Sequence, residues 1–105
     1  MNKEEIKKLH LEVHLSMREY YSFLETRVAD GEREARLPFE QANKKFDAMI
    51  GAENTEIFEA KLSEALMPYN CGSGSSHNID SQMPEMLGCN KLSEFLGLEI
   101  IEEMF

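Results

Sequence analysis

The chain has few cysteines and no long hydrophobic segment. Its two cysteines, Cys71 and Cys89, are too few for a disulfide framework, and we expect both to be reduced. No run approaches the roughly 20 apolar residues that span a bilayer, and the charged start MNKEEIKKLH is unlike a signal peptide. These absences predict a cytoplasmic protein that makes no contact with a membrane.

Basic residues are scarce in the second half of the sequence. Residues 1–50 carry nine Lys and Arg against ten Asp and Glu, a net charge of −1, whereas residues 51–105 carry two against ten, a net charge of −8. Nucleic-acid binding requires cationic side chains that neutralise phosphates, so this half argues against a nucleic-acid partner. The charge distribution instead predicts a protein partner with a basic surface.

Proline and glycine are also few, with three prolines and six glycines in 105 residues, and this favours long helices. Asn2 can cap a first helix. Apolar residues then recur every three or four positions, as in one face of a helix: Ile6, Leu9, Val13, Met17, Tyr20, Leu24 and Val28. About 27 helical residues would extend roughly 40 Å, which is long for a domain of this size. We therefore expect a long N-terminal amphipathic helix that pairs with another copy, giving a homo-oligomer.

Glycine and capping residues suggest where the next helices begin and end. Gly31 is the first signal for the end of a helix, and Pro38 is expected in the first turn of a second helix. Gly51 ends that helix, and Asn54 or Thr55 caps a third.

The last third of the sequence predicts a long loop and a short final helix. The third helix stops at Pro68, and a glycine- and serine-rich loop follows at about 68–82. After a turn at 83–87, Asn90 caps a last helix, which Gly97 interrupts; the tail 98–105 is expected to be helical, with a short strand at 98–101 as the alternative. The predicted fold is a single all-α domain, residues 1–105, with four to five helices.

The segment NCGSGSSHNID at 70–80 is a candidate anion-binding loop, because glycine backbone N–H groups and serine hydroxyls can bind phosphate. It lacks the lysine of a phosphate-binding loop, so basic residues of the first helix would have to supply the charge. A flexible connector is the other interpretation of this segment. The candidate ligand-binding residues are Tyr69, Gly72, Ser73, Gly74, Ser75, Ser76, His77, Lys7, Lys8 and Arg18.

Histidine and cysteine give weak metal and catalytic signals. His10 and His14 have the i, i+4 spacing of helical zinc ligands, but HLEVH lacks the glutamate of the zinc-protease motif. The spacing of Cys71, His77 and Cys89 matches no common zinc module, and nothing fixes Cys71 against His77 as a nucleophile and base. We therefore expect no metal, no cofactor and no enzymatic activity, and we expect His10 and His14 to be half-exposed beside the apolar stripe.

The absence of catalytic motifs favours a binding function. The leading hypothesis is a small acidic inhibitor or adaptor, of the kind found among phage-encoded or other accessory regulators, that docks on a larger protein. The alternative is a protein that sequesters or senses a small anionic ligand such as a nucleotide, using the 70–80 loop at an oligomer interface. Candidate interface residues lie on the first helix: Val13, Met17, Tyr20, Tyr21 and Leu24.

Overall fold

Four α-helices follow one another along the described part of the chain. The computed structural model describes residues 2–26, 30–69 and 79–105. The helices are α1 (Lys3–Glu25), α2 (Glu32–Ile50), α3 (Ala52–Leu66) and α4 (Ile79–Met104), and a short 3-10 helix, η1 (Met67–Tyr69), follows α3. No strand occurs in these ranges, which confirms the all-α fold class with four helices.

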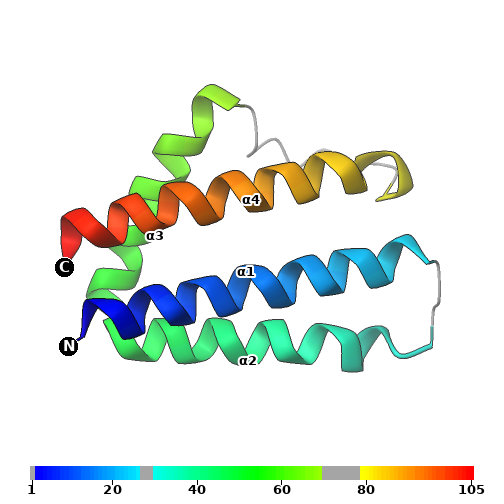
Figure 1. Cartoon of the computed structure of the whole chain (residues 1–105), viewed down its shortest axis with the longest axis horizontal. Helices are drawn as coiled ribbons and strands as arrows, with labels where there is room; N and C mark the ends of the chain where they lie inside the picture. The colour runs from blue at the N-terminus through cyan, green and yellow to red at the C-terminus, as the bar shows by residue number, and fades with distance from the viewer. Residues whose placement is uncertain (1, 27–29, 70–78) are drawn as a thin grey trace.

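α1 lies between α2 and α4, and both neighbours run antiparallel to it (Figure 1). α3 crosses behind α4, contacts α4 more than α2, and extends with η1 beyond the layer of the other three helices. α1 has 23 residues and α4 has 26, so the expectation of one dominant N-terminal helix is not confirmed. α1 packs against α2 and α4 of its own chain instead of projecting from the domain.

The capping residues agree with the sequence only in part. Asn2 caps α1, with its side chain accepting a hydrogen bond from the Glu4 backbone N–H at 3.0 Å. Gly31, expected to end the first helix, instead caps the start of α2 with a φ of 90°, a conformation that glycine adopts without strain. Pro38 consequently lies inside α2 and not in its first turn.

Gly51 ends α2 as predicted, and α3 begins immediately afterwards at Ala52. The prediction that Asn54 or Thr55 caps α3 is wrong. Their side chains donate backwards to the carbonyls of Ile50 and Gly51, both at 2.9 Å, a bond that side chains within the first turn of a helix can make.

α4 differs most from the prediction. A single helix runs through the expected turn at 83–87 and through both Gly88 and Gly97. A glycine inside a helix costs about 1 kcal/mol relative to alanine, and here tertiary packing outweighs that cost. Asn90 is therefore inside the helix, where its side chain bonds to α1 and caps nothing. The prediction that the tail is helical is confirmed.

The hydrophobic core lies where the four helices meet. Three of its side chains, Ile6, Ile50 and Ile101, are completely or almost completely buried. The phenyl rings of Phe46 and Phe58 meet edge to face with their centroids 5.3 Å apart, a preferred geometry for aromatic pairs. Among the residues whose burial the structure describes, the buried apolar ones are Ile6, Val13, Ala42, Phe46, Ile50, Phe58, Ile100 and Ile101.

Candidate functional site

The residues predicted to bind an anion are dispersed. Gly72, Ser73, Gly74, Ser75, Ser76 and His77 lie outside the described residues. Tyr69, at the end of η1, is exposed, and Lys8 is exposed on α1. Lys7 and Arg18 form ion pairs with Glu102 and Glu94 of α4, so both contribute charge to the contact between α1 and α4.

The predicted interface residues contact their own chain. Val13 is part of the core, and Met17, Tyr20, Tyr21 and Leu24 are half-buried. The Tyr20 hydroxyl donates a hydrogen bond to Glu32 of α2 at 2.5 Å. Partial burial, followed by the Glu32 carboxylate, raises the pKa of Tyr20 above its usual range. These residues therefore help to join α1 to its neighbours.

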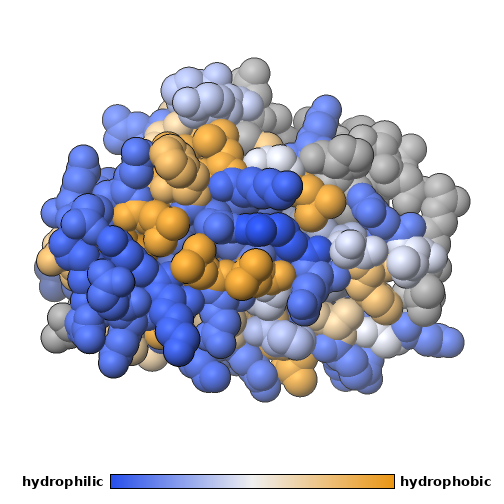
Figure 2. All heavy atoms as spheres, viewed as in Figure 1, coloured by the Kyte–Doolittle hydropathy of each residue, from blue (hydrophilic) through white to orange (hydrophobic). Residues whose placement is uncertain are grey.

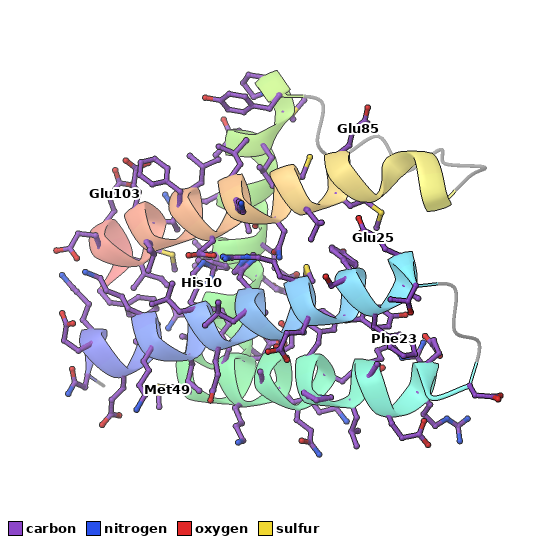
Figure 3. The ribbon with its side chains drawn as sticks, turned by 45° about the vertical axis from the view of Figure 1, so that its right-hand side comes forward. His10, Phe23, Glu25, Met49, Glu85 and Glu103 are labelled. Atoms are coloured by element: carbon purple, nitrogen blue, oxygen red, sulfur yellow. The ribbon has the colours of Figure 1, made fainter. Side chains whose placement is uncertain are left out.

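His10 and His14 are buried, which contradicts the expectation of half-exposed side chains. Only 2% of His10 and 5% of His14 is exposed, and His10 lies between α1 and α4 (Figure 3). The two rings meet edge to face with centroids 4.5 Å apart. We name the contact between α1 and α4 around these rings the histidine seam; its members are His10, His14, Arg18, Asn90, Glu94 and Gly97, of which Arg18 and Glu94 are half-buried.

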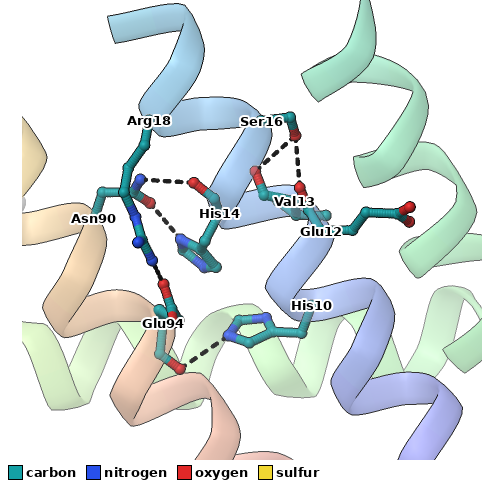
Figure 4. Close-up of polar contacts among 8 residues, drawn as sticks. All are labelled: His10, Glu12, Val13, His14, Ser16, Arg18, Asn90 and Glu94. Atoms are coloured by element: carbon teal, nitrogen blue, oxygen red, sulfur yellow. Dashed lines mark hydrogen bonds and ion pairs between the residues drawn. The ribbon is translucent and has the colours of Figure 1, made fainter. Parts of the chain in front are cut away.

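His14 and Asn90 form a reciprocal pair across the histidine seam (Figure 4). The Asn90 side-chain N–H donates to the His14 backbone carbonyl at 3.1 Å, which orients its oxygen towards His14 Nδ1. An amide oxygen can only accept, so His14 carries its proton on Nδ1. Both side chains are buried, and buried polar groups require hydrogen-bond partners. His14 and Asn90 each supply a hydrogen-bond partner to the other.

His10 is enclosed by the other helices. Its Nε2 lies 3.2 Å from the backbone carbonyl of Glu94 and donates to it (Figure 4). The rings of Phe46 in α2 and Phe58 in α3 each lie 5.6 Å from the His10 ring. Beneath the ring is Gly97, where an added Cβ would come closer than 3.0 Å to His10. The absence of a side chain at this position is what allows His10 to fit between the helices.

Burial keeps both histidines neutral. It lowers the pKa of His10 from 6.5 to about 3, and the neighbouring His14 acts in the same direction. Burial also lowers the pKa of His14, and this outweighs the opposing effect of its bond to Asn90. The buried interface therefore selects the uncharged form of both rings.

Ion pairs lie on either side of the histidines along α1 and α4. Arg18 contacts Glu94, and Lys3 and Lys7 contact Glu102. The side chains of Lys3 and Glu102 are 31% and 57% exposed, so water screens this pair and it stabilises the fold only slightly.

The two rings of the histidine seam are closed off from solvent by the packing of the helices. They are also bonded within the chain, so they offer no open position to a substrate. Within the described residues no three His, Cys, Asp or Glu side chains converge as a metal site would require. Cys71 and His77, considered as possible metal ligands, lie outside the described residues.

The outer face of α3 is the second notable feature. α3 packs against α4 and less extensively against α2, which leaves its opposite side exposed. Ile57 and Met67 are exposed there, together with the glutamates Glu53, Glu56 and Glu64. On the face of the molecule seen in Figure 2, hydrophobic residues form small patches separated by hydrophilic ones.

Sequence reasoning missed the roles of Asn90, Glu94 and Gly97. A signal was present, because Asn90, Glu94, Gly97 and Ile101 follow one another at intervals of four, three and four residues, which places them on one face of an uninterrupted helix. The prediction that Gly97 interrupts the helix divided these four residues between two segments, so their common face was not recognised.

No described helix is both long enough and apolar enough to cross a membrane. Comparisons of the chain with protein-family models, with curated proteins and with solved structures find no match.

Proposed function

We propose that this chain is a small acidic binding protein without catalytic activity of its own, an inhibitor or adaptor that docks on a larger protein. Its contact surface is the outer face of α3 and η1, which we name the α3 ridge. The members of the α3 ridge are all exposed: Glu53, Glu56, Ile57, Ala60, Glu64 and Met67.

The observation that carries this proposal is a row of exposed side chains in which three apolar residues are interspersed with two glutamates. Glu53, Ile57, Ala60, Glu64 and Met67 follow one another at intervals of four, three, four and three residues, the spacing of neighbours along one helix face. Ile57 is 43% exposed and Met67 is 70% exposed. Covering exposed apolar side chains such as Ile57 and Met67 with a partner is favourable in free energy.

The charge of α3 is not neutralised within the described part of the chain. α3 carries four glutamates against the single Lys61, a net charge of −3, and none of the four forms an ion pair with a described residue. By contrast, Arg36 of α2 contacts both Glu32 and Glu40. The unpaired glutamates favour a basic partner surface, which they would attract over several ångströms and orient on arrival.

Substitution of Ile57 tests the α3 ridge. The chain would be used to capture partners from the lysate of its source cell, and the affinity of a captured partner would then be measured with purified components. We expect Ile57→Ser to weaken binding about tenfold, since covering such a side chain contributes on the order of 1 kcal/mol or more. Glu53→Gln combined with Glu56→Gln should slow association and reduce the dependence of binding on salt.

Leu37→Ser on α2 is the matched control, because Leu37 is 47% exposed and Ile57 is 43% exposed. It should leave the affinity unchanged. Equal losses for Ile57→Ser and Leu37→Ser, or binding that is unaltered by 0.5 M salt, would contradict the proposal.

A further inference from the structure

We propose that the histidine seam is an acid-sensitive contact: protonation of His10 and His14 separates α4 from α1. This inference concerns the fold of the isolated chain and does not depend on the proposed binding function. It rests on the hydrogen bonds, the packing and the charges around the two rings.

A second proton would make either ring a buried cation; the backbone of Ser93 favours the charged form of His10, but burial and the neighbouring His14 outweigh it. His10 already donates from Nε2 to the Glu94 carbonyl, so the added proton would go to Nδ1. His14 already donates from Nδ1 to Asn90, so its added proton would go to Nε2. A buried charge is unfavourable unless it is paired and hydrogen-bonded.

The charged groups around the rings do not favour two more positive charges. On α1, the two histidine rings face one another with centroids 4.5 Å apart, and Arg18 adds a positive charge near His14. On α4, the Glu94 carboxylate is engaged by Arg18, and Asn90 is uncharged.

The other two helices supply apolar groups to the same site. α2 places Phe46 and α3 places Phe58 against the His10 ring, each with its ring centroid 5.6 Å from that of His10. Neither ring can compensate a positive charge in the way that a carboxylate would. In the closed state, in which α4 is packed against α1, the packing therefore excludes both water and an opposite charge from His10.

The direction of the pH dependence follows from the lowered pKa values. A separated histidine takes up a proton near pH 6.5, whereas His10 in the closed state does so only at about pH 3. The stabilisation by neutral His10 is thus fully present above pH 6.5 and is lost progressively as the pH falls towards 3.

The size of the effect can be stated as a population ratio. When the pH falls from 7.5 to 5, protonation of His10 alone raises the ratio of open molecules, in which α4 is separated from α1, to closed molecules about 30-fold. The reason is that each pH unit below the ordinary pKa contributes about tenfold. His14, whose pKa is also lowered, adds to this change in the same direction.

Opening of the histidine seam would expose the centre of the core. Ile6 of α1 and Ile101 of α4, both fully buried, lie along the same two helices as the histidines. Backbone amides of α1 and α4 should therefore exchange with solvent more readily when the contact opens. This provides a readout that requires no partner or ligand.

Hydrogen exchange and urea unfolding at pH 7.5 and 5 test the proposal. After correction for the intrinsic exchange rate, we expect the opening ratio of α1 and α4 to rise at least about 30-fold in the natural chain. The double variant His10→Gln, His14→Gln keeps a side-chain N–H donor at each position but cannot titrate, so most of this rise should disappear. If the double variant does not fold, either single variant should lose its own part of the rise.

His77→Gln is the control, because it removes the third histidine, which is not a member of the histidine seam; we expect it to keep the natural pH profile. Side-chain ¹⁵N NMR adds a direct measurement of the rings, and we expect His10 to stay neutral in the folded chain at pH 5.5 and the pKa of His14 to lie below its ordinary value. Folded-state titration of both rings near pH 6.5 would overturn the proposal. An unchanged pH dependence in the glutamine variants would also overturn it.

Discussion

Replacing Gly97 with alanine tests the contact between α1 and α4 at a single atom. The added Cβ would come closer than 3.0 Å to the His10 ring, a separation that real Cβ atoms do not show. His10 cannot simply turn away, because His14, Phe46 and Phe58 surround its ring. The two helices would have to move apart, or His10 would have to give up its bond to the Glu94 carbonyl.

Two opposing terms determine the size of this effect. Alanine is better than glycine in a helix by about 1 kcal/mol, and Gly97 has no positive φ that would forbid the change. Overpacking of a filled interior costs about 1–3 kcal/mol and occasionally more, and the lost buried hydrogen bond adds about 1 kcal/mol. We therefore expect Gly97→Ala to lower the free energy of unfolding by about 1–3 kcal/mol.

Gly88 offers a matched control on the same helix. An added Cβ at Gly88 meets no atom within 4 Å, so Gly88→Ala should raise the free energy of unfolding by up to about 1 kcal/mol. Urea unfolding at pH 7.5, followed by far-ultraviolet circular dichroism, measures both variants. A difference in sign between the two substitutions is the expected result.

A double-mutant cycle with His10→Ala assigns the cost to His10. Once the ring is removed, Gly97→Ala should become neutral or stabilising by up to about 1 kcal/mol, giving a coupling energy of about 1–4 kcal/mol between the positions. The reasoning would be refuted if Gly97→Ala were as stable as Gly88→Ala. It would also be refuted if the cost of Gly97→Ala were the same with and without the His10 ring.

Two further substitutions test the core and the ion pairs. Phe58→Ala should lower the free energy of unfolding by about 3–5 kcal/mol, because it leaves a cavity beside His10 and Phe46; a loss below about 1 kcal/mol in urea unfolding would contradict the packing. Glu102→Gln should lower the melting temperature only slightly, since its ion pairs with Lys3 and Lys7 are exposed, and the difference should vanish in 1 M NaCl. Lys7 and Lys3 lower the pKa of Glu102, so the contribution of Glu102 is present above its ordinary pKa of 4.5 and is lost as the pH falls through its folded-state value.

Local chemistry made some features predictable from the sequence. Asn2 caps α1 because its side-chain oxygen satisfies an otherwise unpaired N–H within two residues. Gly51 separates α2 from α3 because its φ of 87° suits glycine. The repeat of apolar residues through Ile6 and Val13 likewise identified residues of the core.

The candidate sites were less predictable, because they depend on which helices meet. His10 and His14 are adjacent to the apolar stripe of α1, and their positions in the sequence do not distinguish the edge of a helix from an interface with a second one. Asn90 and Gly97 resemble a cap and a helix breaker when only neighbouring residues are considered. Both roles were wrong because α4 packs against α1, 76 residues away at the His14–Asn90 pair.

The sequence by itself determined that this protein is acidic and all-helical, because charge is a sum over residues and helix formation is governed by spacings of three and four. Only the tertiary structure decided that two histidines are buried and neutral, that Gly97 gives space to His10, and that Ile57 of α3 stays exposed. The physical reason is that burial is shared between helices distant in sequence. The neutral state of His10 arises from atoms of all four helices together, and no segment of the chain contains them all.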